Sequence, residues 1–490
     1  MSKKQVSSKW KTKAMERGQE NNALRKRFKE MTESRDNFRV KYYDLNNLYK
    51  ELEKTNRKLE KEEKKSTNEK PKHHSFSLII IQVILTITLR SNIKFRALET
   101  DGKIRAEIIE DNDEAPSHVT IRNWTLKVGF YQLTQPKEKA DDWVILLDHS
   151  IQFGKEKIFT IFGIREKYLL ELDRPLQRSD LVPLLINPEG KWNGLLVLDE
   201  ILELQKELGK IKYAVGDYGS DIKKGLRLAG IIHIHDLSHL ISLVIEKIFD
   251  KDIKYNELKD KMSLMRSKFR QTILACLVPP KKRKKSEYQS FDKLIKWAED
   301  ILNLINNTLN DEDKVKKIKK EFNDAPLAEI KKEFSWINDY RELITELSQI
   351  NEVVKEIEKD MKHSGFSLKT LENAKKSLAK LQSTNGEKLK HDLTIKLEEQ
   401  FELLPEGMEK VLFSSDILES TFGAYKNRVS ENPMASVTNL MLIIAAYTCN
   451  LTQENVKKCI ENVKMSDIKT WSDDNIGIST HKQRNALLRA

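Results

Sequence analysis

The segment Tyr213-Ala-Val-Gly-Asp217-Tyr-Gly-Ser-Asp221-Ile-Lys-Lys-Gly225 contains an apolar run that stops just before an acidic residue. Residues 211–215 have the composition of a buried strand, and residues 220–228 have the spacing of a helix. An acidic residue that ends a strand lies where an open sheet collects its ligands. The stretch therefore predicts a strand, a turn and a helix, with Asp217 in a candidate site.

Apolar runs on either side of this stretch predict the rest of a mixed sheet flanked by helices. The run 143–147 ends at Asp148, just as 211–215 ends before Asp217. The expected order is β-β-β-α-β-α-β-α, which is typical of an α/β domain. The strands are predicted at 143–147, 157–164, 168–172, 211–215 and 231–234, and the helices at 193–208, 220–228 and 237–249.

Asp148 and Asp217 suggest a site for divalent cations. Two neighbouring carboxylates repel each other unless a cation lies between them, and hard oxygen ligands suit Mg²⁺ or Mn²⁺. A third acid on a packed helix would complete a two-metal site. Such a site activates the attacking oxygen and stabilises the leaving oxygen in phosphoryl transfer.

Four segments resemble bacterial DDE-type transposases, and the segment that contains Asp217 is one of them. The resemblance covers roughly residues 105–240 and 410–430. The other segments are Trp143-Val-Ile-Leu-Leu-Asp148-His, Ile232-His-Ile-His235-Asp236-Leu-Ser-His239 and Ser415-Asp-Ile-Leu-Glu419-Ser-Thr-Phe-Gly423-Ala-Tyr-Lys426.

The resemblance implies an RNase H-like catalytic domain in a metal-dependent DNA recombinase. Asp148, Asp217 and Glu419 would hold two Mg²⁺ (or Mn²⁺) ions, water would nick the ends of a transposon, and the freed 3′-OH would attack target DNA. It also implies double-stranded DNA as partner and a location in the bacterial cytoplasm, associated with the nucleoid. Some of these transposases have a signature of Glu, six residues and Lys, preceded by Tyr and Arg, in which the Lys contacts DNA. Lys426, seven residues after Glu419, would be that Lys, although Leu412 and Ser415 stand in the places of the Tyr and the Arg.

Other acids compete for the same roles. Asp221 or Asp236 could replace Asp217 as a ligand, and Asp416 could replace Glu419. The order of the predicted elements favours Asp217, because it ends a strand directly. His149, His235 and His239 could assist in the site or simply pack.

About 200 residues separate Asp217 from Glu419, and residues 251–405 are rich in Lys, Glu and Leu with helical spacing. We interpret this span as an all-α insertion that carries an exposed basic loop, 281–285. The expected domains are a basic coiled coil and linker (1–72), a small helical DNA-binding domain (73–140), the catalytic domain (141–250 and 406–430), the insertion (251–405), and C-terminal helices with a tail (431–490).

The N-terminal segment predicts a coiled coil. Apolar residues recur every seven positions, and residues 1–72 hold 22 Lys and Arg against 12 Asp and Glu, which accounts for most of the net charge of +12. An apolar stripe this narrow must pack against another helix. A second copy of the chain is the simplest partner, and the rest of the same chain is the alternative. The basic surplus favours an anionic partner such as nucleic acid. The repeating positions are Leu24, Met31, Phe38, Leu45, Leu52 and Leu59.

Residues 73–140 predict a helix-turn-helix. Ser117 is placed to cap a helix that buries Val119, Trp124 and Val128. His118, Arg122, Asn123 and Lys127 are left for the outside, and the last three are candidate DNA contacts. The apolar run 76–89 is shorter than the roughly 20 residues needed to span a bilayer, so no membrane contact is expected.

The sequence is compatible with three functions. The leading one is an active transposase. The others are an RNase H-like nuclease without strand transfer, and a non-enzymatic DNA-binding or scaffolding protein derived from a transposase. Cys276, Cys449 and Cys459 have no metal-ligand spacing, and no Gly-x-x-x-x-Gly-Lys-Ser/Thr loop is present.

We expect deletion of residues 1–70 to lower the oligomeric state, because the predicted coiled coil supplies the dimer contact. Light scattering of the full chain and the deletion variant measures this. A molecular mass that is unchanged, after allowing for the deleted residues, would contradict the dimer.

Overall fold

The computed structural model describes Met31 and residues 69–109, 115–153, 156–172, 174–281, 287–404, 408, 410–429 and 436–489. Residues 1–78 and 79–490 form two compact units. Most of the predicted coiled coil and of the basic loop 281–285 lies outside the described residues, so both stay predictions.

The second unit contains a five-stranded mixed sheet, in the order β3-β2-β1-β4-β5. β1 and β2, and β2 and β3, are antiparallel, whereas β1 and β4, and β4 and β5, are parallel. The expected mixed sheet flanked by helices is confirmed. The strands are β1 (Ala140–Phe153), β2 (Glu156–Arg165), β3 (Val182–Glu189), β4 (Gly209–Gly216) and β5 (Ile232–His235).

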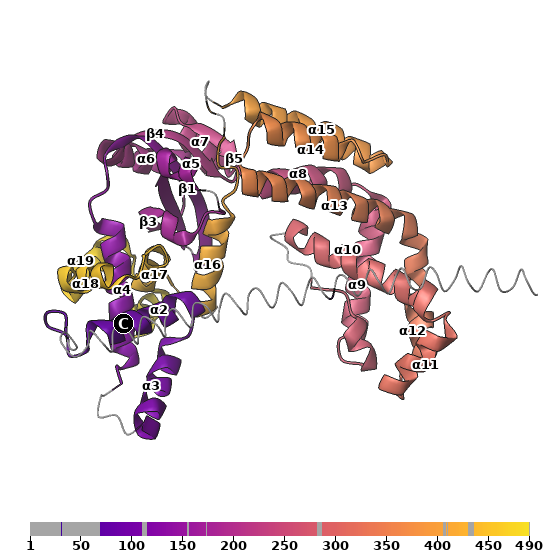
Figure 1. Cartoon of the computed structure of the whole chain (residues 1–490), viewed down its shortest axis with the longest axis horizontal. Helices are drawn as coiled ribbons and strands as arrows, with labels where there is room; N and C mark the ends of the chain where they lie inside the picture. The colour runs from indigo at the N-terminus through magenta and orange to yellow at the C-terminus, as the bar shows by residue number, and fades with distance from the viewer. Residues whose placement is uncertain are drawn as a thin grey trace, which may run out of the picture. The chain divides into compact units, whose positions relative to one another are not determined.

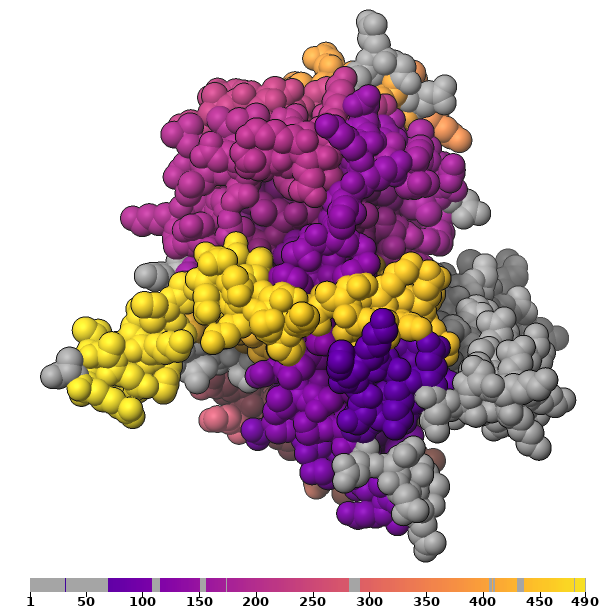
Figure 2. Space-filling model, turned by 90° about the vertical axis from the view of Figure 1, so that its left-hand side faces the viewer, coloured from indigo at the N-terminus to yellow at the C-terminus, as the bar shows by residue number. Residues whose placement is uncertain are grey.

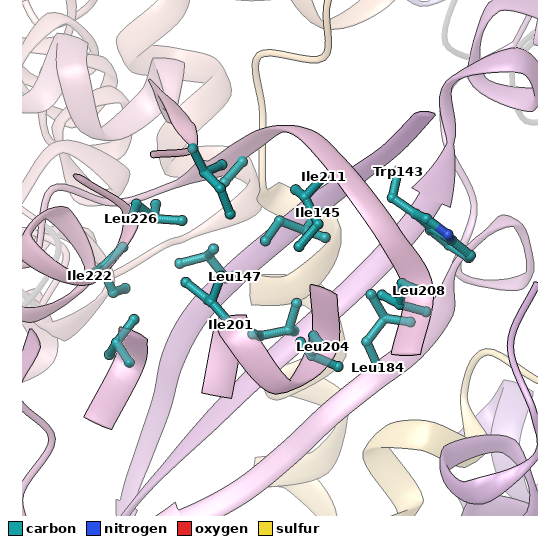
Figure 3. Packing of buried hydrophobic residues seen from close by; sticks show 14 of the residues in the cluster. Trp143, Ile145, Leu147, Leu184, Ile201, Leu204, Leu208, Ile211, Ile222 and Leu226 are labelled. Atoms are coloured by element: carbon teal, nitrogen blue, oxygen red, sulfur yellow. The ribbon is translucent and has the colours of Figure 1, made fainter. Parts of the chain in front are cut away.

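Helices α6 (Gly194–Leu208) and α7 (Ser220–Leu228) cover one face of the sheet, where they bury a hydrophobic core (Figure 3). Asn193 caps α6 by accepting hydrogen bonds from the amides of Leu195 and Leu196. Helix α16 (Asp416–Arg428) lies alongside β1 (Figure 1). Residues from the centre of the chain and from near its C-terminus therefore meet at the same sheet.

Two expectations about the strands were wrong. Residues 168–172 are not the third strand, because most of them belong to the short helix α5 (Glu166–Glu171). The third strand is β3, whose Pro183 and Pro188 hide it in the sequence. Proline is tolerated there because β3 is an edge strand of the sheet. β1 also does not end at Asp148 but continues to Phe153, paired with β2.

The other described elements are helical, including those predicted between 251 and 405. No described helix is long and apolar enough to cross a membrane. The α-helices are α2 (Leu78–Ser91), α3 (Phe95–Ile109), α4 (His118–Thr134), α8 (Leu237–Phe249), α9 (Ile253–Phe269), α10 (Glu287–Asn303), α11 (Glu312–Glu321), α12 (Leu327–Phe334), α13 (Arg341–Ser364), α14 (Leu368–Leu378), α15 (Thr384–Glu402), α17 (Leu442–Ala446), α18 (Gln453–Asn462), α19 (Met465–Asn475) and α20 (Thr480–Arg489).

Helix α4 is a central helix rather than a surface helix. Ser117 caps it as expected, by accepting a hydrogen bond from the amide of Thr120. Its middle turns pack against α3, α17, α18 and α19, and Trp124 and Val128 are buried, although Val119 is exposed. In Figure 2 the C-terminal residues, in yellow, lie between the indigo and violet helices and the magenta residues of the sheet.

Gly129 is where α4 and α17 approach most closely, because an added Cβ would lie 2.0 Å from the carbonyl oxygen of Leu442. We expect Gly129→Ala to lower the free energy of unfolding by about 1–3 kcal/mol or more, since the two helices must separate. Gly423 in α16 is the matched control, because its added Cβ meets no atom within 4 Å. Gly423→Ala should raise the free energy of unfolding by about 0.5–1 kcal/mol through helix propensity. Urea unfolding measures both, and equal effects would contradict the close packing of α4 on α17.

Candidate functional site

The register of β1 and β4 brings Asp148 and Asp217 together. Leu147 is paired with Gly216 across the two parallel strands, and Asp148 and Asp217 directly follow these two residues, so the two aspartates are neighbours. Neighbouring strands lie roughly 4.8 Å apart. Leu147 belongs to the core beneath α6 and α7, so Asp148 points to the other face of the sheet.

Helix α16 supplies Glu419 to the same place. The helix buries Leu418, Phe422 and Tyr425, and Glu419 follows Leu418 with a side chain that is 32% exposed. The pKa of the Asp148 carboxyl is raised well above its usual value, first by burial and then by the negative charges of Asp217 and Glu419. All three predicted acids therefore interact electrostatically in one site.

His239, in the first turn of α8, contributes a positive charge. Its Nε2 atom lies 3.1 Å from Oε1 of Glu419. This hydrogen bond, with the charges of Asp236, Glu419 and Asp217, raises the pKa of His239 to about 9. His239 is thus protonated at neutral pH and partly offsets the acidic charge. Among His149, His235 and His239, it is His239 whose ring contacts Glu419.

The chemistry of the three acids fits Mg²⁺ or Mn²⁺. They offer hard carboxylate oxygens, and a cation would relieve the repulsion that raises the pKa of Asp148. The hydroxyl of Thr160, directly across from Asp148 on β2, is buried and has no hydrogen-bond partner. Among the described residues, however, no three His, Cys, Asp or Glu side chains are already close enough to hold an ion. Ion binding would have to draw the carboxylates together.

Two of the competing acids are engaged elsewhere. Oδ2 of Asp221 lies 2.7 Å from Nε2 of His149, and this contact lowers the pKa of Asp221 to about 2. Oδ2 of Asp416 lies 2.7 Å from Nζ of Lys362, which α13 contributes. These ion pairs favour Asp217 and Glu419 as the ligands.

Asp236, the third competing acid, is a buried structural residue. Its side chain accepts hydrogen bonds from the amide of His239 (3.0 Å) and from the amide and hydroxyl of Ser415 (2.6 and 3.0 Å). Its own amide donates to the carbonyl oxygen of Gly216 at 2.8 Å. The Ser415 hydroxyl donates to Asp236 and makes no capping hydrogen bond to α16. Asp236 therefore positions the segments that carry Asp217, His239 and Glu419.

The far end of α16 is fixed as well. The guanidinium of Arg428 donates to Oδ1 of Asn92 and to the carbonyl oxygen of Ile93, each at 3.1 Å. These contacts and those of Asp236 hold both ends of the helix that carries Glu419. Lys426, two turns after Glu419, is exposed.

The candidate DNA contacts on α4 differ in exposure. Arg122 is exposed and Asn123 is half-buried. Lys127 was expected on the outside, but it is buried and its ammonium donates to the carbonyl oxygen of Ile460 at 3.0 Å. The packing of α18 on α4 places this carbonyl beside the lysine, so the expectation that Lys127 faces outward was wrong.

The sequence pattern missed Thr160 and Lys362. Thr160 lies in an apolar strand, and only the strand register shows that it faces Asp148. Lys362 is one of many lysines in the helical region, and its role depends on the packing of α13 against α16. Neither residue carries a signal in the sequence.

Comparisons with known proteins give little further information. No protein-family model matches the chain, and no match was found among curated protein sequences. Among solved structures, the Drosophila P element transposase strand transfer complex covers 81% of this chain and 98% of its own, at 12% sequence identity and a TM-score of 0.39. A similarity this distant carries no argument about function.

We expect Asp148→Asn to stabilise the fold at neutral pH when divalent ions are absent. The folded-state pKa of Asp148 is raised, so its ionisation destabilises the native state as the pH rises above the unfolded value. A neutral amide of the same shape removes this effect, and each kcal/mol gained would raise Tm by a few degrees.

Thermal unfolding between pH 4 and 8 measures this effect. The gain should shrink towards pH 4, where the wild-type carboxyl is protonated. Mg²⁺ should raise the Tm of the wild type more than that of Asp148→Asn. A variant that is less stable than wild type at pH 7.5 would contradict the electrostatic interpretation.

Proposed function

We propose that this chain is a DDE-type DNA transposase with an RNase H-like catalytic domain. The observation that supports the proposal is that Asp148 on β1, Asp217 after β4 and Glu419 on α16 share one site, where burial and then the charges of Asp217 and Glu419 raise the pKa of Asp148. Glu419 comes from a helix about 200 residues beyond Asp217, in the order that the resemblance to DDE transposases implied. The proposed reaction is cleavage of transposon ends, followed by attack of the 3′-OH on target DNA.

Asp148, Asp217 and Glu419 would hold two Mg²⁺ or Mn²⁺ ions. Bound divalent ions supply the Lewis acidity that activates an attacking oxygen and stabilises a leaving oxygen. The chain's own part is positioning. Protonated His239 donates to Oε1 of Glu419 and holds that carboxylate in place. Asp236 holds α8 and the start of α16 against the end of β4.

Double-stranded DNA is the proposed partner. Arg122, Asn123 and Lys426 are proposed to contact it, the first and last because they are exposed. A homodimer through residues 1–72 would bring two DNA ends together, and residues 251–405 would be an insertion in the catalytic domain. The proposed location is the bacterial cytoplasm, associated with the nucleoid.

Cleavage of supercoiled plasmid that carries the native flanking DNA tests the proposal, with Mg²⁺, Mn²⁺ or EDTA. We expect metal-dependent nicking by the wild type and a loss of at least roughly 100-fold in Asp217→Asn and Glu419→Gln, since even residues behind a metal ligand typically cost 10–100-fold. Asp416→Asn is the matched control, because Asp416 lies one turn before Glu419 and pairs with Lys362. It should keep most of the activity.

The products separate the three functions. Joined DNA molecules with 3′ ends in the target support a transposase. Nicking without joining would support a nuclease that uses the same three acids. DNA binding without cleavage in either metal would make the non-enzymatic DNA-binding protein the better account.

A further inference from the structure

A cavity of about 420 Å³ lies beside the candidate site, between α8, α15 and the turn that follows β4. Tyr218, which directly follows Asp217 in the chain, lines it. The cavity therefore borders the segment that carries one of the three acids, although none of these acids lines it.

The aromatic wall of the cavity is rigid. The rings of Tyr218 and His235 are stacked, with centroids 3.7 Å apart and planes 11° from parallel. Gln400 fixes both residues, because its amide nitrogen donates to the Tyr218 hydroxyl at 2.9 Å and its oxygen accepts from the His235 amide at 2.7 Å. A wall held this way can select a ligand by shape.

His235 also offers an unused polar group. Its side chain is 3% exposed, and Nε2 has no hydrogen-bond partner. Burial lowers the pKa of His235 to about 3, so the ring is neutral at physiological pH. Solvent does not reach Nε2, so a ligand bonds to it only by displacing the side chains that cover it, and a buried polar atom left without a partner is costly.

The remaining walls combine apolar, basic and acidic groups, the acids being Asp392 and Glu399. Leu240, Leu243, Val244 and Ile395 supply the apolar surface. Lys223 extends its ammonium over the Tyr218 ring, 5.1 Å from the centroid, and has no acidic partner among the described residues. The other two lysines are paired with acids, Lys247 with Asp392 and Lys396 with Glu399. Lys223 is thus the cation that is available for an anion.

We propose that this cavity receives one unpaired nucleotide of the DNA strand bound at the candidate site. The base would lie between the apolar walls and exchange a hydrogen bond with Nε2 of His235, and its phosphate would lie near Lys223. A base is flat, largely apolar and polar at its edge, which matches these walls, and the volume is within the range of ligand sites. Bases extruded from a duplex are held by such combinations of stacking and edge contacts. The proposal rests on the proposed function.

Binding of matched DNA duplexes tests the proposal. Fluorescence anisotropy of the full chain in EDTA compares a duplex that carries one unpaired adenosine with the fully paired duplex of the same sequence. We expect the wild type to bind the bulged duplex about tenfold more tightly. Leu243 is 53% exposed, so Leu243→Trp should fold while its indole fills the cavity, and it should abolish the preference. Leu264→Trp, at a 62% exposed leucine of α9 outside the cavity, should keep it.

Three other outcomes would contradict either the role of the cavity or the proposed function. No preference in the wild type, or a preference that Leu243→Trp retains, would overturn the cavity's role while leaving the proposed function intact. Failure to bind either duplex would count against the proposed function itself. Binding of free dAMP that Leu243→Trp abolishes, without any preference for the bulge, would assign the cavity to a free nucleotide instead of DNA.

Discussion

The buried carboxylate of Asp236 is the interaction on which the arrangement of the site depends. It accepts hydrogen bonds from His239 and Ser415, while its amide is bonded to Gly216 next to Asp217. Three segments far apart in the sequence are fixed against one another by this one residue. Loss of the carboxylate would leave buried donors without acceptors, which costs more than a surface hydrogen bond.

The rigid frame holds acids that repel each other. Burial and neighbouring charges disfavour the ionised form of Asp148, and protonated His239 offsets only part of this charge. The frame also includes Arg428 at the end of α16. Unfavourable repulsion between the acids persists at a site when the surrounding structure fixes the positions of the residues. Such a frame keeps the acids available for cations and prevents the site from relaxing by moving α16.

The sequence predicted the parts of the fold that depend on local pattern. The apolar runs that lead to Asp148 and Asp217 became β1 and β4, and α7 and α8 have the predicted bounds. β3 was missed because two prolines interrupt an edge strand. Lys127 was misplaced because a helix that is buried on several sides has no single apolar face. The choice among Asp217, Asp221 and Asp236 required their partners, some of which are more than 70 residues away.

The proposed chemistry depends on Asp148, Asp217 and Glu419 binding divalent ions together. Anomalous diffraction at the manganese edge, from crystals of the full chain soaked in Mn²⁺, would locate these ions. We expect anomalous peaks bounded by oxygens of all three carboxylates in the wild type, and their loss in crystals of Glu419→Gln. Manganese bound only elsewhere, with the three carboxylates ordered and free of metal, would contradict this expectation.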